Sequence, residues 1–402
     1  MSSENIGDTQ SGPRLLVVDD NDDNRYTLTL QLEIEGYQDI ATADDGEAAL
    51  EMLQTREFDL VLLDVMMPKL DGYQVLERLK RDGRLHNVPV IMISALNEIE
   101  SVVRCIEMGA TDYLPKPFNT VLLRARVGAT LEKKRLRDRE RLWARSLERE
   151  LEIGREIQQS FLPEELPQPA GWEIAATFQP ARQVAGDFYD AFPLAGGSRI
   201  GLVVADVCDK GVGAALFMAL FRSLVRAFSQ RAYATPPSER DPDAARLLST
   251  ILSTNDYIAK THGRSNMFAT LFLGVLDPAG GTLTWVNAGH EAPVVFGAAG
   301  TSARLTPTGP ALGMMPDMKF EARTAHLAPG ETLFAFTDGV TEARDAAGRL
   351  FSEARLLALV AEGVPSAAAL LDRVEAAVSA HATGVERSDD ITMLAARRAN
   401  GG

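Results

Sequence analysis

The stretch Leu60-Val61-Leu62-Leu63-Asp64 is a run of four apolar residues that ends in a carboxylate. Short apolar runs of the same kind lie on both sides of it, separated by amphipathic patterns such as Tyr26–Glu35, Gly46–Thr55 and Gly72–Arg81. Continuously apolar strands that alternate with helices are typical of a parallel sheet covered on both faces. We therefore expect an α/β doubly wound domain with five parallel strands, which are Leu15–Asp19, Asp39–Ala43, Leu60–Asp64, Pro89–Ser94 and Thr111–Leu114.

Polar side chains stand where the strands of this predicted sheet end. The pair Asp19-Asp20 follows the first strand, Asp64 ends the third, Ser94 ends the fourth and Lys116 follows the fifth. The carboxyl ends of neighbouring strands in such a sheet meet in one crevice, so we expect these side chains to lie together. There Asp64 can attack phosphorus as a nucleophile while Asp19 and Asp20 hold Mg²⁺. Ser94 can donate a hydrogen bond, and Lys116 can place a positive charge, beside the acyl phosphate that forms.

This part of the chain resembles the receiver domain of response regulators over roughly residues 13–130. The motifs that carry the resemblance are Val-Val-Asp-Asp-Asn (17–21), Leu-Leu-Asp-Val-Met-Met-Pro (62–68), Met-Ile-Ser-Ala (92–95) and Tyr-Leu-Pro-Lys-Pro-Phe (113–118). The resemblance implies that Asp64 accepts a phosphoryl group from a histidine kinase or a phosphotransfer protein. It also implies one Mg²⁺ in the receiver site, held by Asp19, Asp20 and Asp64.

The same resemblance implies a switch around the phosphorylated residue. Ser94 and Tyr113 are expected to re-pack when Asp64 is phosphorylated, and the peptide bond between Lys116 and Pro117 is expected to be cis. The alternative is a degenerate receiver that no longer accepts a phosphoryl group. No chemical group that the reaction needs is missing from this sequence.

A long charged segment follows the predicted receiver. Between Glu132 and Glu156 there are nine Lys or Arg and seven Asp or Glu residues, with leucines and Trp143 among them. This pattern predicts a helix with an irregular apolar seam that ends before Pro163. It is either a plain surface helix or a parallel two-stranded coiled coil, and the coiled coil is favoured because the helix has little else to bury against. A coiled coil here predicts a homodimer.

Four aspartates are spread over the C-terminal half of the chain, each in its own short motif. Asp187, Asp206, Asp338 and Asp389 each follow an apolar run or lie in a Gly- or Ser-containing turn. Carboxylates that are gathered in one place repel each other unless a cation binds between them. All-oxygen ligation suits Mg²⁺ or Mn²⁺ better than zinc. The alternative is that they are four unrelated turn residues, since Asp-Gly and Ser-Asp are ordinary turn sequences.

Strands dominate from about Trp172 onward, with helices between them, which indicates an α+β layered fold rather than repeated βαβ units. The predicted strands are Ile200–Asp206, Ala269–Leu276, Leu283–Asn287, Pro293–Phe296 and Thr332–Thr337. The predicted helices are Ala214–Gln230, Asp243–Thr261 and Ser352–Glu362. The proline-rich segment Pro236–Pro242 is predicted to be an exposed loop.

Residues 150–397 resemble the SpoIIE-like bacterial branch of the PPM serine/threonine phosphatases. The motifs that carry this second resemblance are Arg-Glu-Ile-Gln-Gln-Ser-Phe-Leu-Pro (155–163), Ala-Gly-Asp-Phe-Tyr-Asp (185–190), Ala-Asp-Val-Cys-Asp-Lys-Gly-Val-Gly-Ala-Ala-Leu (205–216), Met-Phe-Ala-Thr-Leu-Phe (267–272), Asn-Ala-Gly-His-Glu-Ala-Pro (287–293), Thr-Asp-Gly-Val-Thr-Glu-Ala (337–343) and Ser-Asp-Asp-Ile-Thr (388–392). The fold implied is an α+β layered β-sandwich, and the activity implied is hydrolysis of phosphoserine or phosphothreonine on a protein.

The resemblance also assigns roles to the four aspartates, in which two Mn²⁺ or Mg²⁺ ions orient a hydroxide for in-line attack on phosphorus. Asp206 is expected to bridge both ions, assisted by the backbone carbonyl of Val207. Asp187 is expected to serve one ion, and Asp338 and Asp389 the other.

The sequence departs from the family pattern at a few positions. Ala185 replaces the first glycine of Gly-Gly-Asp, and Cys208-Asp209 stand where small residues such as Ser-Gly are frequent. Asp209 is either an extra carboxylate near the metals or, as we favour, a solvated loop charge. His290 is either a general acid or ligand, or, as we favour, a structural residue near the site.

Composition limits the remaining possibilities. The net charge is −15, and no segment carries the large basic excess that a nucleic-acid partner would require. No stretch approaches about 20 uncharged apolar residues, and the N-terminus lacks the features of a signal peptide, so no membrane partner is expected. The two cysteines, Cys105 and Cys208, form no metal spacing and fit a reducing cytoplasm.

Together the sequence predicts a cytoplasmic response regulator whose output is protein dephosphorylation. The expected parts are a disordered tail (1–12), a receiver (13–130), a helical linker (131–162) and a phosphatase domain (163–398). A STAS-type anti-sigma-factor antagonist is the substrate expected at the level of the family. One alternative is a non-catalytic adaptor whose phosphatase fold is a phosphorylation-gated binding surface, but no metal carboxylate is lost. A nucleotide cyclase is another, but its motifs are absent from the sequence.

Overall fold

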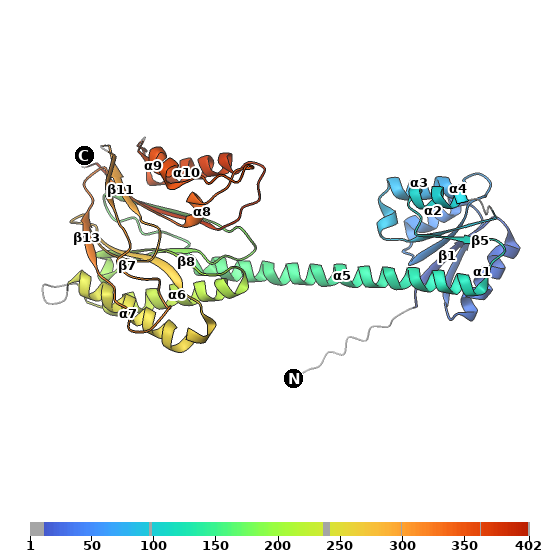
Figure 1. Ribbon diagram of the computed structural model, residues 1–402, viewed down its shortest axis with the longest axis horizontal. Coiled ribbons are helices and arrows are strands. Elements are labelled where there is room, and N and C mark those ends of the chain that lie inside the picture. Colours follow the sequence, from blue (N-terminus) through green and yellow to red (C-terminus); the bar gives the residue numbers. More distant parts are fainter. Residues whose placement is uncertain (1–11, 96–98, 236–241, 299, 362, 401–402) are drawn as a thin grey trace. The chain divides into compact units, whose positions relative to one another are not determined.

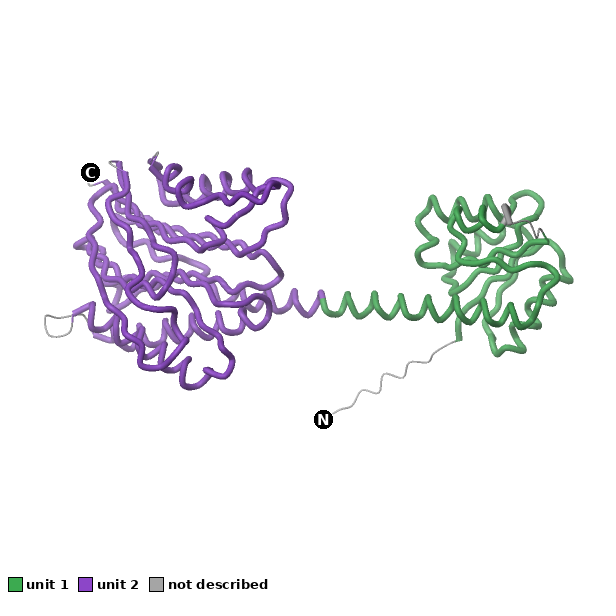
Figure 2. Tube along the Cα trace, in the orientation of Figure 1, with its two compact units in different colours: residues 1–147 green, residues 148–402 purple. Residues whose placement is uncertain are grey.

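The computed structural model describes residues 12–95, 99–235, 242–298, 300–361 and 363–400. The chain divides into two compact units, residues 1–147 and 148–402 (Figure 2). All but the last residue of the predicted N-terminal tail, and all but the last residue of the predicted loop Pro236–Pro242, lie outside the described residues.

The first unit is a five-stranded parallel sheet in the order β2-β1-β3-β4-β5 (Figure 1). Its strands are β1 Arg14–Val18, β2 Asp39–Ala43, β3 Leu60–Asp64, β4 Val90–Ser94 and β5 Asp112–Pro115. Its helices are α1 Asp22–Ile34, α2 Gly46–Thr55, α3 Gly72–Arg81, the 3₁₀ turn η1 Arg84–His86, α4 Ile99–Met108 and the first part of α5 Thr120–Phe161. The predicted doubly wound fold is confirmed.

Both faces of this sheet are buried, which explains why its strands are continuously apolar. Leu28 of α1 and Val127 of α5 pack on one face, while Leu76 of α3 and Cys105 of α4 pack on the other. Helix starts are fixed locally: Asp71 and Gln74 form a reciprocal capping box at α3. The carboxyl ends of β1, β3 and β4 are thereby held side by side.

Helix α5 runs without interruption for 42 residues from the receiver into the second unit. Asn119 caps its start by accepting a hydrogen bond from the Leu122 N–H at 3.0 Å, and the helix ends two residues before Pro163. The predicted boundary between residues 130 and 131 therefore falls inside one helix. Its seam has no partner within the described chain, because these apolar side chains are exposed: Leu136, Leu142, Trp143, Leu147, Ile153 and Ile157.

The second unit is a sandwich of two five-stranded antiparallel sheets, in the orders β13-β10-β9-β8-β7 and β12-β11-β14-β15-β6 (Figure 1). Its strands are β6 Trp172–Gln179, β7 Phe188–Leu194, β8 Arg199–Val207, β9 Ala269–Asp277, β10 Thr282–Ala288, β11 Val294–Gly297, β12 Gly300–Arg304, β13 Arg323–His326, β14 Thr332–Phe336 and β15 Ile391–Arg398. Its helices are α6 Val212–Ala232, α7 Asp243–His262, α8 Asp338–Thr341, α9 Glu353–Val360 and α10 Ala367–His381, with 3₁₀ turns η2 Ala195–Gly197 and η3 Gly263–Ser265.

Helices cover both outer faces of the sandwich, which confirms the predicted α+β layered fold. Phe221 of α6 and Ile251 of α7 pack on the first sheet, and Leu370 of α10 packs on the second. Between the sheets, residues such as Leu202 and Leu394 form a separate core. The central strands of the sandwich are thus covered on two faces, whereas the edge strands β12 and β13 stay largely exposed.

Sequence reasoning missed several of these strands. Strand β7, for example, contains Asp190 and Pro193 among its apolar residues, and β15 ends in two arginines, so neither shows a clean apolar run. Neither strand was predicted, although the acidic motifs that contain Asp187 and Asp389 immediately precede them.

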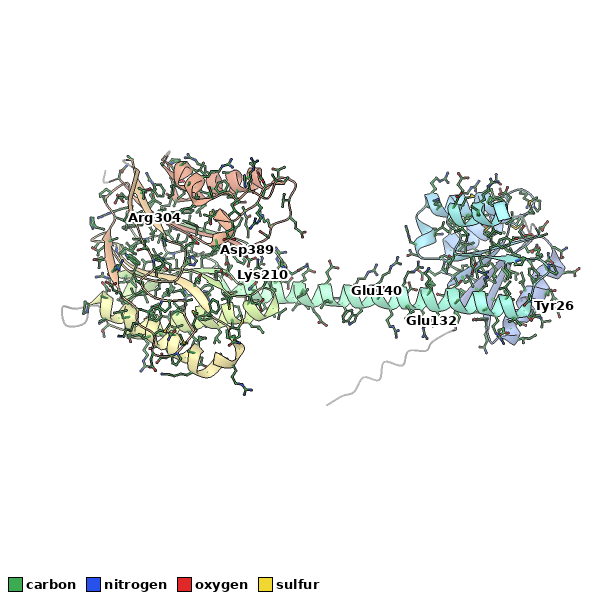
Figure 3. All side chains as sticks on the ribbon, in the orientation of Figure 1. Tyr26, Glu132, Glu140, Lys210, Arg304 and Asp389 are labelled. Carbon is green, nitrogen blue, oxygen red and sulfur yellow. The ribbon has the colours of Figure 1, made fainter. Side chains whose placement is uncertain are left out.

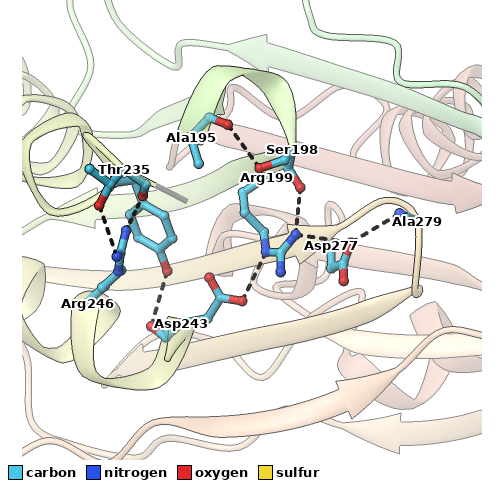
Figure 4. A network of polar contacts seen from close by, with 9 residues as sticks. Ala195, Ser198, Arg199, Thr235, Asp243, Arg246, Asp277 and Ala279 are labelled. Carbon is cyan, nitrogen blue, oxygen red and sulfur yellow. Dashed lines mark hydrogen bonds and ion pairs between the residues drawn. The ribbon is translucent and has the colours of Figure 1, made fainter. Parts of the chain in front are cut away.

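A network of polar contacts ties the first sheet to its covering helices (Figure 4). The Arg199 guanidinium at the start of β8 donates to the Asp243 carboxylate of α7 at 3.0 Å and pairs with Asp277 of β9 at 3.2 Å. The Tyr233 hydroxyl donates to the Asp243 carbonyl at 3.1 Å, and Arg246 donates to Thr235. These contacts fix α7 against the sheet at the end remote from the acidic motifs.

Helix α6 is long and apolar enough, by length and composition alone, to cross a membrane. In the structure its buried face, which includes Ala214, Met218 and Phe221, belongs to the core beneath the first sheet. That packing accounts for part of the apolar composition of the helix, since Val212 and Leu216 remain exposed.

Candidate active sites

The receiver site lies where the strands of the parallel sheet end. Asp19, Asp20 and Asp64 have carboxylate oxygens that all lie within 4.8 Å of one another. The Lys116 ammonium pairs with Asp19 at 2.7 Å and with Asp64 at 2.9 Å. Asp19 also accepts hydrogen bonds from the Asn21 N–H and the Asn24 amide, both at 3.0 Å. The structure thus brings together the residues that were predicted to hold Mg²⁺ and the phosphoryl group.

Burial sets the charges of this site. Burial raises the pKa of Asp64 above its ordinary value, although the hydrogen bond from Lys116 opposes the shift. Burial alone would lower the pKa of Lys116, but its hydrogen bonds to Asp19 and Asp64 outweigh that effect and raise it. Lys116 therefore stays charged between the two carboxylates and neutralises part of their negative charge. The carboxylate oxygens are the kind of ligand that a hard cation such as Mg²⁺ prefers.

The predicted switch residues flank this site. Ser94 ends β4 and is buried, and the Tyr113 hydroxyl donates to the Ser94 carbonyl at 3.3 Å. The peptide bond between Lys116 and Pro117 is cis, as predicted. Ser94 and Tyr113 therefore already touch each other, with Tyr113 turned inward.

The second site is built at one end of the sandwich from both sheets. Asp187 directly precedes β7 and Asp206 lies near the end of β8, and the register Phe188 to Ala205 sets these two aspartates opposite each other. Asp338 opens α8 just after β14, and Asp389 lies two residues before β15. Because β14 and β15 are neighbours in the other sheet, all four motifs emerge at the same end.

The charges of the four aspartates act on one another. Asp206 raises the pKa of Asp187, Asp338 raises that of Asp206, and Asp389 raises that of Asp338. In each case burial is the larger cause, and it brings the pKa of Asp206 to about 7 and that of Asp338 to about 6. Such a set of oxygen donors is costly without a cation, and it fits Mg²⁺ or Mn²⁺. Within the described residues, the only three acidic groups with oxygens all within 4.8 Å are those of the receiver, so this second cluster is looser.

Asp187 is the most firmly held member of the cluster. It is buried and accepts a hydrogen bond from the Thr337 hydroxyl at 2.7 Å, and that same hydroxyl accepts the Thr392 N–H at 3.0 Å. Thr392 belongs to β15 and Thr337 directly follows β14, both of the second sheet, whereas Asp187 directly precedes β7 of the first. This short relay of hydrogen bonds therefore joins the two sheets at the site.

Two glycines let the backbone approach closely there. A Cβ atom at Gly186 would lie 2.8 Å from the carbonyl oxygen of Val207, the carbonyl predicted to assist Asp206. A Cβ atom at Gly339 would lie only 1.9 Å from the carbonyl oxygen of Asp390. Side chains at these positions would push apart the segments that carry the carboxylates.

Lys210 already neutralises part of the cluster. Its ammonium pairs with Asp389 at 2.7 Å and donates to the Ser388 carbonyl at 2.7 Å (Figure 3). A cation that binds Asp389 must therefore displace or repel this ammonium.

Sequence reasoning missed the role of Asp390. Its carboxylate accepts the Ala181 N–H at 2.8 Å and the Gly186 N–H at 3.0 Å, and so fixes the loop that leads to Asp187. The signal was present, since Asp390 follows Asp389 directly in Ser-Asp-Asp-Ile-Thr, but the sequence alone did not show which of the two faces the loop.

The structure also places Asp209 and His290. Asp209 is exposed and accepts a hydrogen bond from the N–H of the next residue, Lys210, which is how a solvated loop charge behaves. His290 is buried with its Nδ1 2.9 Å from the Thr270 hydroxyl, and burial lowers its pKa to about 4. The Asn287 side chain holds the same turn, because its amide nitrogen donates to the His290 carbonyl and its amide oxygen accepts the His290 N–H. A neutral imidazole in such a turn supports the structural interpretation.

Comparisons with known proteins identify the families that the two units resemble. A family model described as stage II sporulation protein E (SpoIIE) matches residues 196–399, just over half of the chain. The chain belongs to the SpoIIE family. A model of the response regulator receiver domain matches residues 15–128, so this SpoIIE-family chain joins a receiver domain to a PPM-type phosphatase domain.

Individual relatives match parts of the chain. Protein IcfG of Synechocystis sp. (strain ATCC 27184 / PCC 6803 / Kazusa) is 44% identical over 62% of this chain and 41% of its own length. The transcriptional regulator RpaA of the same organism is 39% identical over 30% of this chain and 50% of its own length. The chain spans about half of the length, or less, of the curated relatives it matches. The solved SiaA-PP2C domain of Pseudomonas aeruginosa shares the fold, with 22% identity, a TM-score of 0.51, and coverage of 63% of this chain and 98% of that one.

The raised pKa values predict how stability depends on pH in the metal-free SpoIIE-family unit. Asp206, whose pKa is about 7, keeps a proton that the unfolded chain releases near pH 4. Its stabilising contribution is therefore complete below about pH 4 and is lost as pH rises through 7. We expect Asp206→Asn to melt several degrees above the wild type in chelator at pH 8, at ~2–4 °C per kcal/mol, and the gap to shrink toward pH 5.

His290 has a lowered pKa, so its contribution to stability changes with pH in the opposite direction. Because His290 is present in both proteins, this contribution cancels when the melting temperature of the wild type is subtracted from that of Asp206→Asn. The exposed Asp372→Asn serves as the control and should show no such pH-dependent gap. Equal melting temperatures of Asp206→Asn and the wild type at pH 8 would contradict the repulsion inferred for the cluster.

The ion pair of Lys210 predicts competition with metal. Lys210→Met should tighten Mn²⁺ binding to the sandwich site, by roughly fivefold at most, because a partly exposed ion pair contributes up to about 1 kcal/mol. Calorimetric titration with Mn²⁺ would measure this. Lys260→Met removes an ion pair of the same 2.7 Å length, with Asp256, outside the acidic cluster and should leave the affinity unchanged. Weaker binding by Lys210→Met would show that the lysine assists the metal site rather than competing with the ion.

Proposed function

We propose that this protein is a response regulator in which phosphorylation of Asp64 controls a Mn²⁺- or Mg²⁺-dependent protein serine/threonine phosphatase. The observation that carries the proposal is the gathering of Asp187, Asp206, Asp338 and Asp389, from both sheets, around one end of the sandwich. Nothing in the packing of a binding module calls for mutually repelling carboxylates at the ends of two sheets. An adaptor that had lost catalysis would be free to lose them.

In this proposal the residues divide the work as follows. Asp206, with the carbonyl of Val207, would hold both cations, Asp187 would hold one, and Asp338 and Asp389 the other. Divalent cations bound there supply an activated water molecule and neutralise phosphoryl charge. The chain itself contributes orientation, since Thr337 fixes the Asp187 carboxylate at 2.7 Å.

The receiver would supply the input. Asp64 would take a phosphoryl group from a histidine kinase or phosphotransfer protein, with one Mg²⁺ held by Asp19, Asp20 and Asp64. Lys116, which already pairs with Asp19 and Asp64, would neutralise the acyl phosphate, and Ser94 would donate to it. The inward-turned Tyr113 lies against Ser94, where it can re-pack as Ser94 moves.

We further propose the limits 13–130 for the receiver, 131–162 for the linker and 163–398 for the phosphatase domain, and a cytoplasmic location. The substrate class we propose is a phosphoserine or phosphothreonine on a STAS-type anti-sigma-factor antagonist. This last step follows from membership of the SpoIIE family, and the site residues themselves encode only the phosphoester chemistry.

The proposal predicts a linked set of kinetic results for the full chain. The wild type should hydrolyse p-nitrophenyl phosphate and a phosphoserine protein with Mn²⁺, and beryllofluoride with Mg²⁺ should change the rate on the protein several-fold. Asp206→Asn and Asp338→Asn should lose at least about 100-fold in rate, because losing a carboxylate empties the metal site. Asp64→Asn should respond no longer to beryllofluoride.

Near-wild-type hydrolysis by Asp206→Asn at saturating Mn²⁺ would refute the proposed mechanism. An identical rate with and without beryllofluoride would refute control through Asp64 while leaving the phosphatase intact. Absence of Mn²⁺-dependent hydrolysis by the wild type, together with beryllofluoride-dependent capture of a phosphoprotein, would establish the adaptor instead.

We also propose that α5 pairs with α5 of a second copy. Its apolar seam is exposed along a helix that carries charged side chains such as Glu132 and Glu140 on its other faces (Figure 3). A lone helix of this composition gains little by folding alone, and pairing would bury Leu136, Trp143 and Leu147. The seam is interrupted by charge, so its register is weakly fixed and suited to two alternative packings.

Leu147→Glu should weaken the dimer at least tenfold in sedimentation experiments at tens of micromolar protein. Arg149→Glu places the same side chain on the exposed charged surface of the helix and serves as the matched control. A wild type that sediments as a monomer at these concentrations, with and without beryllofluoride, would refute the pairing.

A further inference from the structure

The last turns of α5 contain one residue that does not fit an exposed helix. Between Leu131 and Phe161, all of which the structure describes, Gln158 is the one buried residue, at 5% exposure. The preceding residue, Ile157, is 57% exposed. A buried amide is unfavourable unless its donor and its acceptor both find partners, so this position has a specific contact rather than general packing.

That contact is a two-point hydrogen bond to a single residue of the loop before β7. The Gln158 amide nitrogen donates to the Ala185 carbonyl at 2.6 Å, and the Ala185 N–H donates to the Gln158 side-chain oxygen at 3.0 Å. Two antiparallel hydrogen bonds fix both the position and the orientation of the peptide groups they hold. No displacement of α5 at Gln158 can therefore leave Ala185 unaffected while both bonds persist.

Ala185 is followed directly by two residues of the metal site. The N–H of Gly186 donates to Asp390 at 3.0 Å, and the Gly186 Cα is packed so closely that an added Cβ would lie 2.8 Å from the Val207 carbonyl oxygen. The next residue is Asp187. The loop is thus held from one side by α5 and from the other by the residue that follows Asp389.

We propose that Gln158 is a positioning residue that couples α5 to the metal site: its amide sets the place of Ala185, and through Gly186 the place of Asp187. This inference rests on the proposed function and deepens it, because it names the contact through which a movement of α5 would change metal binding. Leu162 packs against the core beneath the first sheet, so the end of the helix is anchored beside the loop it controls.

If Gln158 had a purely structural role, its replacement would have different effects. If the amide only satisfied its own burial, its loss would lower the melting temperature and leave the metal site as it was. If it positions Asp187, its loss changes the affinity for metal and the response to the receiver, whatever it does to stability. Residues that orient metal ligands from outside typically contribute about 10- to 100-fold to metal affinity.

The test compares Gln158→Met with Gln159→Met in the full chain. Methionine keeps the length of the side chain but can form neither hydrogen bond. Gln159 is the adjacent residue of the same type and is exposed. Gln158→Ala serves as a second truncation in case the longer side chain misfolds. The readouts are Mn²⁺ affinity by calorimetry, the change in phosphatase rate with beryllofluoride, and the melting temperature. Asp206→Asn, which removes the carboxylate proposed to hold both cations, gives the Mn²⁺ signal that belongs to the receiver alone.

We expect Gln158→Met to bind Mn²⁺ at the sandwich site at least about tenfold more weakly than Gln159→Met, and to lose most of its response to beryllofluoride. Equal Mn²⁺ affinity and equal response in the two variants would overturn the inference, even if Gln158→Met melted at a lower temperature. If the wild type showed no Mn²⁺ binding beyond that of Asp206→Asn, the proposed function itself would fail, and that result is distinct from the previous one.

Discussion

The repulsion between carboxylates at the end of the sandwich is the constraint on which the rest of the second unit depends. Asp187 and Asp206 are largely removed from water, and each lies within the electrostatic reach of another negative charge. Folding must hold these groups together against both burial and repulsion. It does so with a hydrogen bond from the Thr337 hydroxyl to Asp187, with a bond from the Gly186 N–H to the neighbouring Asp390, and with glycines at the closest approaches. The two-sheet architecture supplies the positions from which these contacts are made.

In the receiver, a lysine reduces the repulsion between clustered carboxylates. Lys116 sits between Asp19 and Asp64 and remains charged because its hydrogen bonds to them outweigh the effect of burial. In the sandwich, Lys210 reaches only the more exposed Asp389, and the buried pair Asp187 and Asp206 has no lysine among the ion pairs that the structure describes. The two sites thus differ in how much of their negative charge the chain itself neutralises.

The sequence was sufficient for the receiver fold and for which residues meet in its crevice, because apolar strands ending in polar residues are a local pattern. It was less informative for the sandwich. Strand β7 mixes Asp190 and Pro193 with aromatic residues, so its sequence shows no apolar run, and its place in the sheet is established by its pairing with the next strand, β8. The contact of Gln158 with Ala185 spans 27 residues and could not be inferred from spacing, since an exposed-looking charged helix gives no sign that one of its glutamines is buried. The different roles of Asp389 and Asp390 could not be inferred either, because Asp390 is identified by its hydrogen bonds to the loop that follows β6.

The relay from Thr392 through Thr337 to Asp187 has a consequence for the motions of the sandwich. This relay crosses from one sheet to the other, so an ion held by carboxylates of both sheets would favour the arrangement in which the relay is intact. Ligand binding to one arrangement stabilises it by mass action, so the opening of the sheets and the release of the ion become one linked equilibrium. Amide hydrogens of β8 and β14 near the site then exchange with solvent at a rate set by the free-ion concentration, whereas those beside Arg199, at the remote end, exchange independently of it.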